Sequence, residues 1–178
     1  MNGLHLFIDN SNLFIEGQRV ARESKSYDDL LVMRFRISYG KLLEYVCRDR
    51  TLKEAVLVGS RPPSNDALWA RLKELGIEPR IFDRSAYSNR EKRVDAELTN
   101  AIRDALEDHP EPGTIALVAG DQDYVPTLER CIKKKWSVEL YFWQQASNEL
   151  KRLTGVEFYD LGDGFDEICF LRATESVV

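Results

Sequence analysis

The stretch LVAGDQDYVP, residues 117–126, decides the fold class of this chain. An apolar run, residues 114–119, ends on a glycine, and two carboxylates, Asp121 and Asp123, follow it one residue apart. This pattern predicts a buried strand that ends at the edge of a sheet and leads directly into a helix. Open α/β sheets bind ligands at the carboxyl ends of their strands. Two acids placed there repel each other, and a divalent cation such as Mg²⁺, which takes oxygen ligands, would relieve the repulsion.

The same two acids have a purely structural interpretation. Asp121 could cap the following helix through its side chain. Asp123 could lie in the first helical turn, where the helix dipole favours negative charge. The pair alone does not decide between a cap and a metal site.

The first apolar run of the chain also ends in a carboxylate. Residues 4–8 are followed by Asp9, and an Asn-Ser-Asn sequence, residues 10–12, comes directly after it. Two strands that each end in an acid predict one shared anionic pocket, provided that the two strands are neighbours in the sheet.

Length and composition indicate one globular domain. The chain has 178 residues, of which 43% are hydrophobic and 31% charged, and this balance is typical of a soluble domain with its own core. We assign residues 1–178 to a single domain, with a core at about 4–161 and a C-terminal tail at 162–178. The net charge of −5 argues against non-specific adhesion to nucleic acid or to an anionic membrane. No signal peptide and no membrane-length apolar run is found, so we expect a cytoplasmic location.

The cysteines and histidines do not form a recognisable metal motif. Cys47, Cys131 and Cys169 are widely spaced and include no CxxC pair, and His5 and His109 do not complete a zinc set with them. We therefore expect reduced, mostly buried cysteines and no zinc site.

Short apolar runs alternate with helical patterns along the chain, which predicts βαβ units and a mainly parallel sheet. The predicted strands are residues 4–9, 54–59, 77–82, 114–119 and 137–143, with a sixth at 156–161. The predicted helices are residues 12–22, 34–49, 64–75, 94–108, 123–135 and 146–153. The helical spacing of Trp69 predicts a core residue. Residues 23–33 are the least clear segment and could form a lid-like loop.

Basic residues follow two of the predicted strands. Arg90, Lys92 and Arg93 end a polar segment, residues 83–93, which could be a solvated connection or an arm that contacts phosphates. Arg61 follows the second strand at the same edge of the sheet, where it could steady a nucleic-acid backbone or simply lie in an exposed turn.

A third acidic position is Asp95, near the start of the helix that precedes the central stretch. It could be a first-turn partner of the helix dipole. With Asp9, Asp121 and Asp123 it would instead complete a cluster of four carboxylates.

Three motifs in order resemble those of the NYN domain family, a branch of the PIN-like nucleases. FIDNSN, residues 7–12, is similar to the family's opening, a hydrophobic residue followed by D-x-x-N. KRVD, residues 92–95, resembles its K-x-V-D motif, and AGDQDYVP, residues 119–126, resembles S-G-D-x-D-F-x-P. The resemblance spans roughly residues 4–161.

The resemblance implies a fold and an activity. The fold is a Rossmann-like three-layer α/β sandwich with a mainly parallel sheet of five or six strands in the order 3-2-1-4-5, which makes the strands ending in Asp9 and Asp121 neighbours. The activity is hydrolysis of RNA with Mg²⁺ or Mn²⁺ held by Asp9, Asp95, Asp121 and Asp123. Asn12 would bond a phosphate oxygen or a coordinated water.

The sequence departs from the family pattern at two positions. The family often carries an aspartate six residues after the acid of K-x-V-D, where this chain has Ala101; Glu97 and Asp104 lie nearby but out of register. Ala119 replaces the serine of the third motif. The loss at position 101 puts a second metal ion in question.

Three alternative functions follow from the same residues. The first is a catalytically silent RNA-binding or regulatory domain. The second is a phosphatase of another Rossmann-like class, which would want an aspartate at position 11, where this chain has Ser11. The third is a toxin-like nuclease paired with an antitoxin protein. The sequence leaves open whether the chain pairs with a copy of itself or with another protein.

Overall fold

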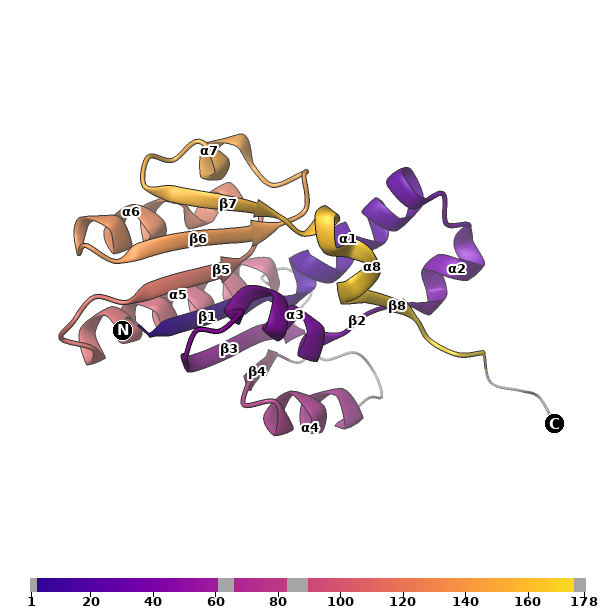
Figure 1. Ribbon diagram of the computed structural model, residues 1–178, viewed down its shortest axis with the longest axis horizontal. Coiled ribbons are helices and arrows are strands. Elements are labelled where there is room, and N and C mark those ends of the chain that lie inside the picture. The colour runs from indigo at the N-terminus through magenta and orange to yellow at the C-terminus, as the bar shows by residue number, and fades with distance from the viewer. Residues whose placement is uncertain (1–2, 61–65, 83–89, 175–178) are drawn as a thin grey trace.

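The computed structural model describes residues 3–60, 66–82 and 90–174. Within them, six parallel strands form one sheet in the order β4-β3-β1-β5-β6-β7, which Figure 1 shows from β7 at the top to β4 at the bottom. The strands are β1 (Leu4–Asp9), β3 (Leu52–Ser60), β4 (Glu78–Phe82), β5 (Thr114–Val118), β6 (Ser137–Phe142) and β7 (Val156–Asp160). Counted as the predicted strands, this order is 3-2-1-4-5-6. The predicted fold class and strand order are confirmed.

Helices cover both faces of this sheet, which gives three layers. One face packs against α1 (Asn10–Lys25), α3 (Tyr39–Cys47) and α4 (Asp66–Glu74), and Trp69 is buried there as predicted. The other face packs against α5 (Arg90–Asp108), α6 (Val125–Lys133) and α7 (Asn148–Lys151). Side chains of β1 alternate between the two cores, with Leu6 and Ile8 in one and Phe7 in the other. A strand buried on both faces reads as a continuous apolar run, which explains the pattern at residues 4–8.

The segment between α1 and α3 differs from the prediction. Residues 23–33 are not a loop, because α1 continues to Lys25 and a short helix, α2 (Asp29–Arg34), follows. The predicted helix at 34–49 is confirmed over α3 but begins too early, because a strand, β2 (Phe35–Ile37), precedes α3. Two caps mark these starts: the Asp28 side chain accepts from the Leu31 N–H, and the Ser38 side chain from the Lys41 N–H.

A second, two-stranded sheet joins this segment to the end of the chain. β2 pairs antiparallel with β8 (Cys169–Leu171), with Ile37 opposite Cys169. A 3-10 turn, η2 (Leu161–Gly164), and a short helix, α8 (Phe165–Ile168), lead into β8, and Phe165 is buried in the main core. Part of the predicted C-terminal tail therefore packs against the domain.

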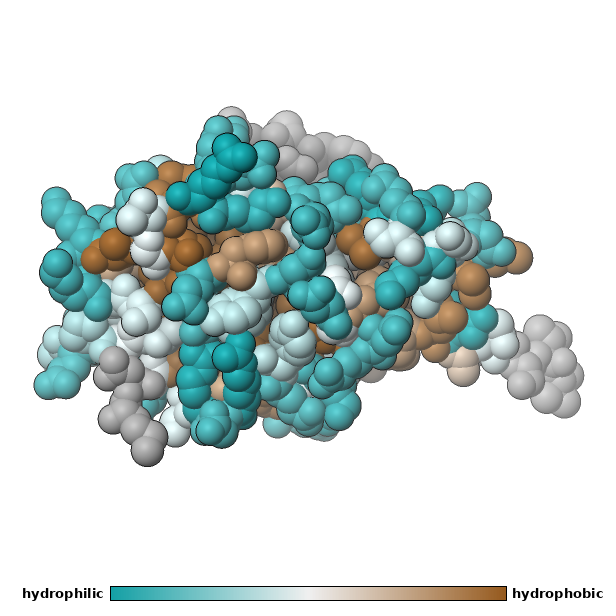
Figure 2. Space-filling view, turned by 45° about the horizontal axis from the view of Figure 1, so that its top comes forward, coloured by the Kyte–Doolittle hydropathy of each residue, from teal (hydrophilic) through white to brown (hydrophobic). Residues whose placement is uncertain are grey.

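The surface is mostly polar. Figure 2 shows a face covered mainly by hydrophilic side chains, with hydrophobic ones toward both ends. Large hydrophobic side chains that are exposed include Leu30 and Met33 of α2. Within the described part of the chain, none of the helices combines the length and the apolar character needed to cross a bilayer. The three cysteines are free, and two of them are buried, as expected.

The turn after β5 has room for glycine alone. The Gly120 N–H donates to Asn12 Oδ1 at 3.2 Å, and the Gly120 carbonyl accepts from the Ser147 N–H at 2.8 Å. A Cβ at this position would lie 2.3 Å from the ring of Phe142, which is buried. The Gly120 backbone can therefore lie against the Phe142 ring of β6 only because Gly120 has no side chain.

We expect Gly120→Ala to lower the free energy of unfolding by about 1–3 kcal/mol, the usual cost of overpacking a core. Urea denaturation of the metal-free protein measures it. Gly40→Ala is the matched control, because a Cβ at Gly40 in α3 would meet nothing closer than 3.7 Å. That variant should keep or gain stability, by up to about 1 kcal/mol, since alanine is the better helix former. Equal effects of the two substitutions would contradict this account of Gly120.

Candidate metal centre

Two predicted site residues meet where the strand order reverses. β1 pairs with β3 on one side and with β5 on the other, and Ile8 lies opposite Val118. Asp9 ends β1, and Asp121 follows β5 at the same edge of the sheet. In open α/β sheets this carboxyl edge, at the reversal of strand order, is where ligands bind.

Three carboxylates converge at this edge. One carboxylate oxygen each from Asp95, Asp121 and Asp123 lies within 4.8 Å of the other two. Asp95 comes from α5, and the other two border the 3-10 turn η1 (Gln122–Tyr124). Asp123 is exposed and the other two are half-buried, so the cluster is open to solvent. We call Asp95, Asp121 and Asp123, together with Asp9, the carboxylate cluster.

Asp9 is the buried member of the carboxylate cluster, with 4% of its surface exposed. Its Oδ1 accepts from the Asn12 N–H and its Oδ2 from the Tyr124 hydroxyl, both at 3.1 Å. Burial raises the pKa of Asp9 to about 6, and the negative charges of Asp95 and Asp121 add to the rise, while the two hydrogen bonds oppose it. Near neutral pH the protein therefore holds a buried carboxylate that a nearby cation would stabilise.

Tyr124 connects two members of the cluster. Its side chain is fully buried, its hydroxyl donates to Asp9, and it also shares a hydrogen bond with Asp95. Burial, followed by the charges of Asp9 and Asp95, holds the pKa of Tyr124 well above its ordinary value, so the hydroxyl stays a donor. In the sequence Tyr124 is only part of a motif, and this role was not predicted. The only signal was a tyrosine where the family motif has phenylalanine.

The structure shows that two of the acids cap helices. Asp9 caps α1, and Asp121 caps η1 by accepting from the Asp123 N–H at 2.9 Å. A carboxylate has two oxygens and several lone pairs, so a cap does not prevent it from binding a cation. The caps fix the orientation of the carboxylates from which a metal site could be built.

Asn12 has a structural contact that the sequence did not reveal. Its Oδ1 accepts from the Gly120 N–H and so ties the start of α1 to the end of β5. The amide NH₂ group of Asn12 is the part of the side chain that could donate to a phosphate oxygen. The neighbouring Asn10 accepts a hydrogen bond from the Tyr39 hydroxyl, which joins α1 to α3.

Most of the predicted basic contacts cannot be placed. Arg61 lies outside the described residues, and so do the side chains of Arg90 and Lys92. The helix α5 starts at Arg90, so residues 90–93 are helical and do not belong to a loop. Arg93 is exposed and lies two residues before Asp95 on α5.

Position 101 belongs to the core. Ala101 is 3% exposed and packs in an apolar cluster with Leu98 and Ile102. A carboxylate there would incur a large desolvation cost. The nearby Glu97 is paired with Arg80 at 2.9 Å, and Asp104 is exposed. Neither residue joins the group of three acids whose oxygens lie close together.

Comparisons with known proteins agree with this architecture. The sequence profile described as "NYN domain" matches residues 4–162. The fold is similar to the crystal structure of a protein of unknown function from Vibrio parahaemolyticus, with 16% identity, a TM-score of 0.64, and coverage of 95% of this chain and 96% of that one. At this identity the likeness shows the fold alone. No curated protein matches the sequence.

The raised pKa of Asp9 predicts a pH dependence of stability without metal. The folded state binds the Asp9 proton more tightly than the unfolded state, so the stability is present at low pH and is lost as pH rises from about 4 through about 6. The asparagine of Asp9→Asn cannot ionise. We therefore expect the variant to lose less stability as pH rises, and its free energy of unfolding at pH 7 to exceed that of the wild type by up to about 3 kcal/mol. Urea denaturation with a chelator at several pH values measures the effect.

Asp28→Asn is the matched control, because Asp28 is an exposed cap of α2 and does not belong to the carboxylate cluster. It should follow the wild-type pH profile. An Asp9→Asn protein that keeps the wild-type pH dependence would show that Asp9 is not the group responsible.

Proposed function

The chain belongs to the NYN domain family, and from that premise we propose that it is a ribonuclease that hydrolyses RNA phosphodiester bonds at the carboxylate cluster with Mg²⁺ or Mn²⁺. The family is a branch of the PIN-like nucleases. The observation that carries the proposal is the convergence of Asp95, Asp121 and Asp123 beside the buried Asp9. These four acids come from three separate parts of the chain, and capping alone does not require them to meet.

The donor set fits a hard divalent cation. Carboxylate oxygens suit Mg²⁺ and Mn²⁺, and the open, solvent-facing side of the cluster leaves room for the waters that Mg²⁺ retains. Asp95, Asp121 and Asp123 would hold the ion. The buried Asp9 would contribute its negative charge beside the ion, and hydrogen bonds from the Tyr124 hydroxyl and the Asn12 N–H hold its two oxygens in place.

When bound, such an ion lowers the pKa of an attacking water and offsets the charge of the scissile phosphate. The protein's own contribution is to fix the acids before the substrate arrives. The caps at Asp9 and Asp121 and the hydrogen bond from Tyr124 hold the carboxylates in fixed positions, so they need not rearrange when the ion or the RNA binds. Arg93, exposed at the start of α5, could contact the RNA backbone beside them, and Arg90, Lys92, Arg61 and the Asn12 amide would be further contacts.

RNA binding without cleavage is the second candidate function. It is favoured by Ala101, because the buried position offers no acid where the family often has one. Metal and RNA binding with no cleavage would support this function and contradict the nuclease proposal.

We expect Asp121→Asn to reduce the rate of RNA cleavage with Mg²⁺ or Mn²⁺ by on the order of 100-fold or more, since it removes a charge from the metal site. Asparagine can still cap η1, so the fold should remain. Cleavage of a labelled single-stranded RNA under single-turnover conditions measures the rate. The control is Asp28→Asn, which changes the same residue type at another helix cap and should cleave like the wild type. Cleavage that survives Asp121→Asn unchanged would place catalysis elsewhere.

RNA binding should depend on the basic residues at the start of α5. Replacing Arg90, Lys92 and Arg93 with alanine should weaken RNA binding, because fewer phosphates are then neutralised by the protein. The slope of log K against log salt should become shallower by about 0.7 for each such phosphate. Fluorescence anisotropy of a labelled RNA at several salt concentrations, with Asp121→Asn to prevent cleavage, measures both quantities.

The control for this change removes three other exposed cations, Arg130, Lys133 and Lys134, from the far end of α6. It makes the same change in net charge at a distance from the carboxylate cluster. If both triple variants weaken binding equally, the effect comes from the net charge of the protein and not from a local contact.

A further inference from the structure

Both histidines of the chain meet at the edge of the sheet opposite the carboxylate cluster. His5 lies near the start of β1 and His109 directly after α5, yet their ring centroids are 4.4 Å apart. Glu54 on β3 lies opposite His5 in the strand register. One ligand atom from each of the three residues lies within 4.8 Å of the other two. We call His5, His109 and Glu54 the histidine cluster.

The hydrogen bonds of the histidine cluster orient the rings for a cation. His109 Nδ1 donates to the Ala105 carbonyl at 3.0 Å, and because a carbonyl can only accept, the neutral ring carries its lone pair on Nε2. A backbone acceptor of this kind is what fixes the tautomer of metal-binding histidines. His5 Nδ1 and Glu54 Oε1 share a proton at 2.7 Å. A cation between these two atoms would displace that proton, which the neutral His5 ring can carry on Nε2 instead.

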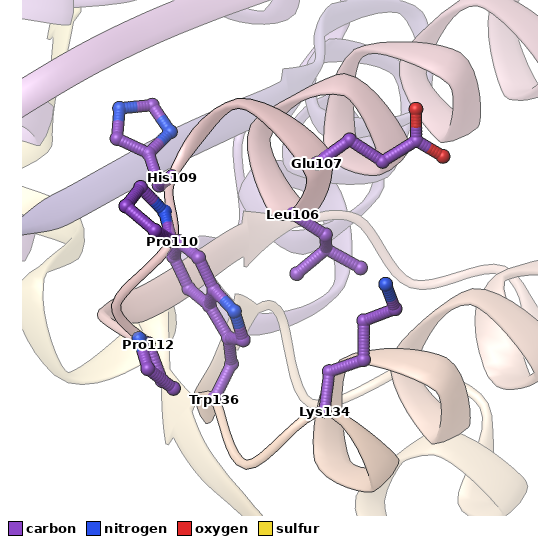
Figure 3. Close-up of a pocket in the computed structure, with 7 residues that line it drawn as sticks. All are labelled: Leu106, Glu107, His109, Pro110, Pro112, Lys134 and Trp136. Atoms are coloured by element: carbon purple, nitrogen blue, oxygen red, sulfur yellow. The ribbon is translucent and has the colours of Figure 1, made fainter.

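The surroundings of the histidine cluster favour a bound cation. His109 follows the C-terminus of α5, where the helix dipole attracts positive charge. His5 is 2% exposed and packs edge-on against Trp136, which excludes competing water from one side. His109 and Trp136 also line a pocket of about 440 Å³, and Figure 3 shows His109 across this pocket from Leu106 and Lys134. The Glu54 side chain is 34% exposed, so an ion could reach the cluster from solvent.

We propose that the histidine cluster is a second metal site and that it binds Zn²⁺. Two imidazoles and one carboxylate suit Zn²⁺ and not Mg²⁺. At metal–ligand distances of about 2.0–2.1 Å, tetrahedral ligand atoms lie roughly 3.3 Å apart. To bind the ion, His5 Nδ1 and Glu54 Oε1, now 2.7 Å apart, would separate slightly. The ligand atom of His109, now within 4.8 Å of those of the other two residues, would move closer to them. Three protein ligands leave the fourth position to water.

This site is independent of the proposed nuclease site. His5 and Asp9 lie on the same strand, four residues apart, which places them roughly 13 Å from each other. The histidine cluster joins β1, β3 and the segment after α5, so a bound ion would link three parts of the fold. Because the three ligands meet in the folded state, Zn²⁺ should bind that state more tightly and raise the unfolding temperature.

The chain has only two histidines, so NMR can follow the site directly. We expect long-range ¹H–¹⁵N spectra of the wild-type protein in excess Mg²⁺ to show a proton on Nδ1 of His109. On adding ZnCl₂, both histidine signals should shift to new positions and saturate at one equivalent, with the proton of His5 on Nε2 and that of His109 still on Nδ1. If neither histidine signal moves at one equivalent of Zn²⁺, the proposal is wrong.

Variants test which residues bind the ion. His109→Gln and Glu54→Gln should each weaken Zn²⁺ binding at least tenfold and reduce the zinc-dependent rise in unfolding temperature. The matched control is Glu107→Gln, because Glu107 lines the same pocket but does not belong to the histidine cluster. It should bind Zn²⁺ like the wild type. Wild-type Zn²⁺ affinity in His109→Gln, measured by calorimetry on a variant that folds normally without zinc, would overturn the proposal.

Discussion

The carboxylate of Asp9 is buried at the end of the central strand, and the structure around it depends on how this charge is held. A buried carboxylate without partners costs several kcal/mol, so its two oxygens must be satisfied. The Asn12 N–H serves one oxygen and starts α1, while the Tyr124 hydroxyl serves the other and positions η1 after β5. Burial and neighbouring charges still raise the pKa of Asp9 to about 6, so the site is costly for the protein alone and favourable for a cation. The protein tolerates this local cost because the rest of the fold supplies the stability.

The two edges of the sheet carry different ligand chemistry. At the carboxyl edge, Asp9 ends β1, and Asp121 and Asp123 follow β5, so the donors there are hard oxygens. At the amino edge, His5 meets Glu54 across the β1–β3 pairing, and His109 is brought there by the length of α5. A cation that prefers oxygen ligands and one that prefers nitrogen ligands would therefore bind at separate places, each selected by the type of ligand atom.

The sequence by itself determined the parts of this protein that depend on local pattern. The apolar runs predicted every strand of the large sheet, because strands buried on both faces, such as β1, read as continuous hydrophobic segments. The acids at the ends of two runs and the ordered motifs indicated the carboxylate cluster. The helix and strand between α1 and α3 were missed, because β2 has three residues and is a strand only through its pairing with β8 at the other end of the chain.

Only the tertiary structure decided which side chains meet. The hydroxyl of Tyr124 reaches Asp9 across 115 positions of sequence, and the histidines, which in sequence completed no zinc motif, come together with Glu54. Position 101 was read as a missing acid, and the fold shows that it is a buried core position. Such contacts have no local periodicity, because they arise from the order of strands in the sheet and from the lengths of the helices that connect them.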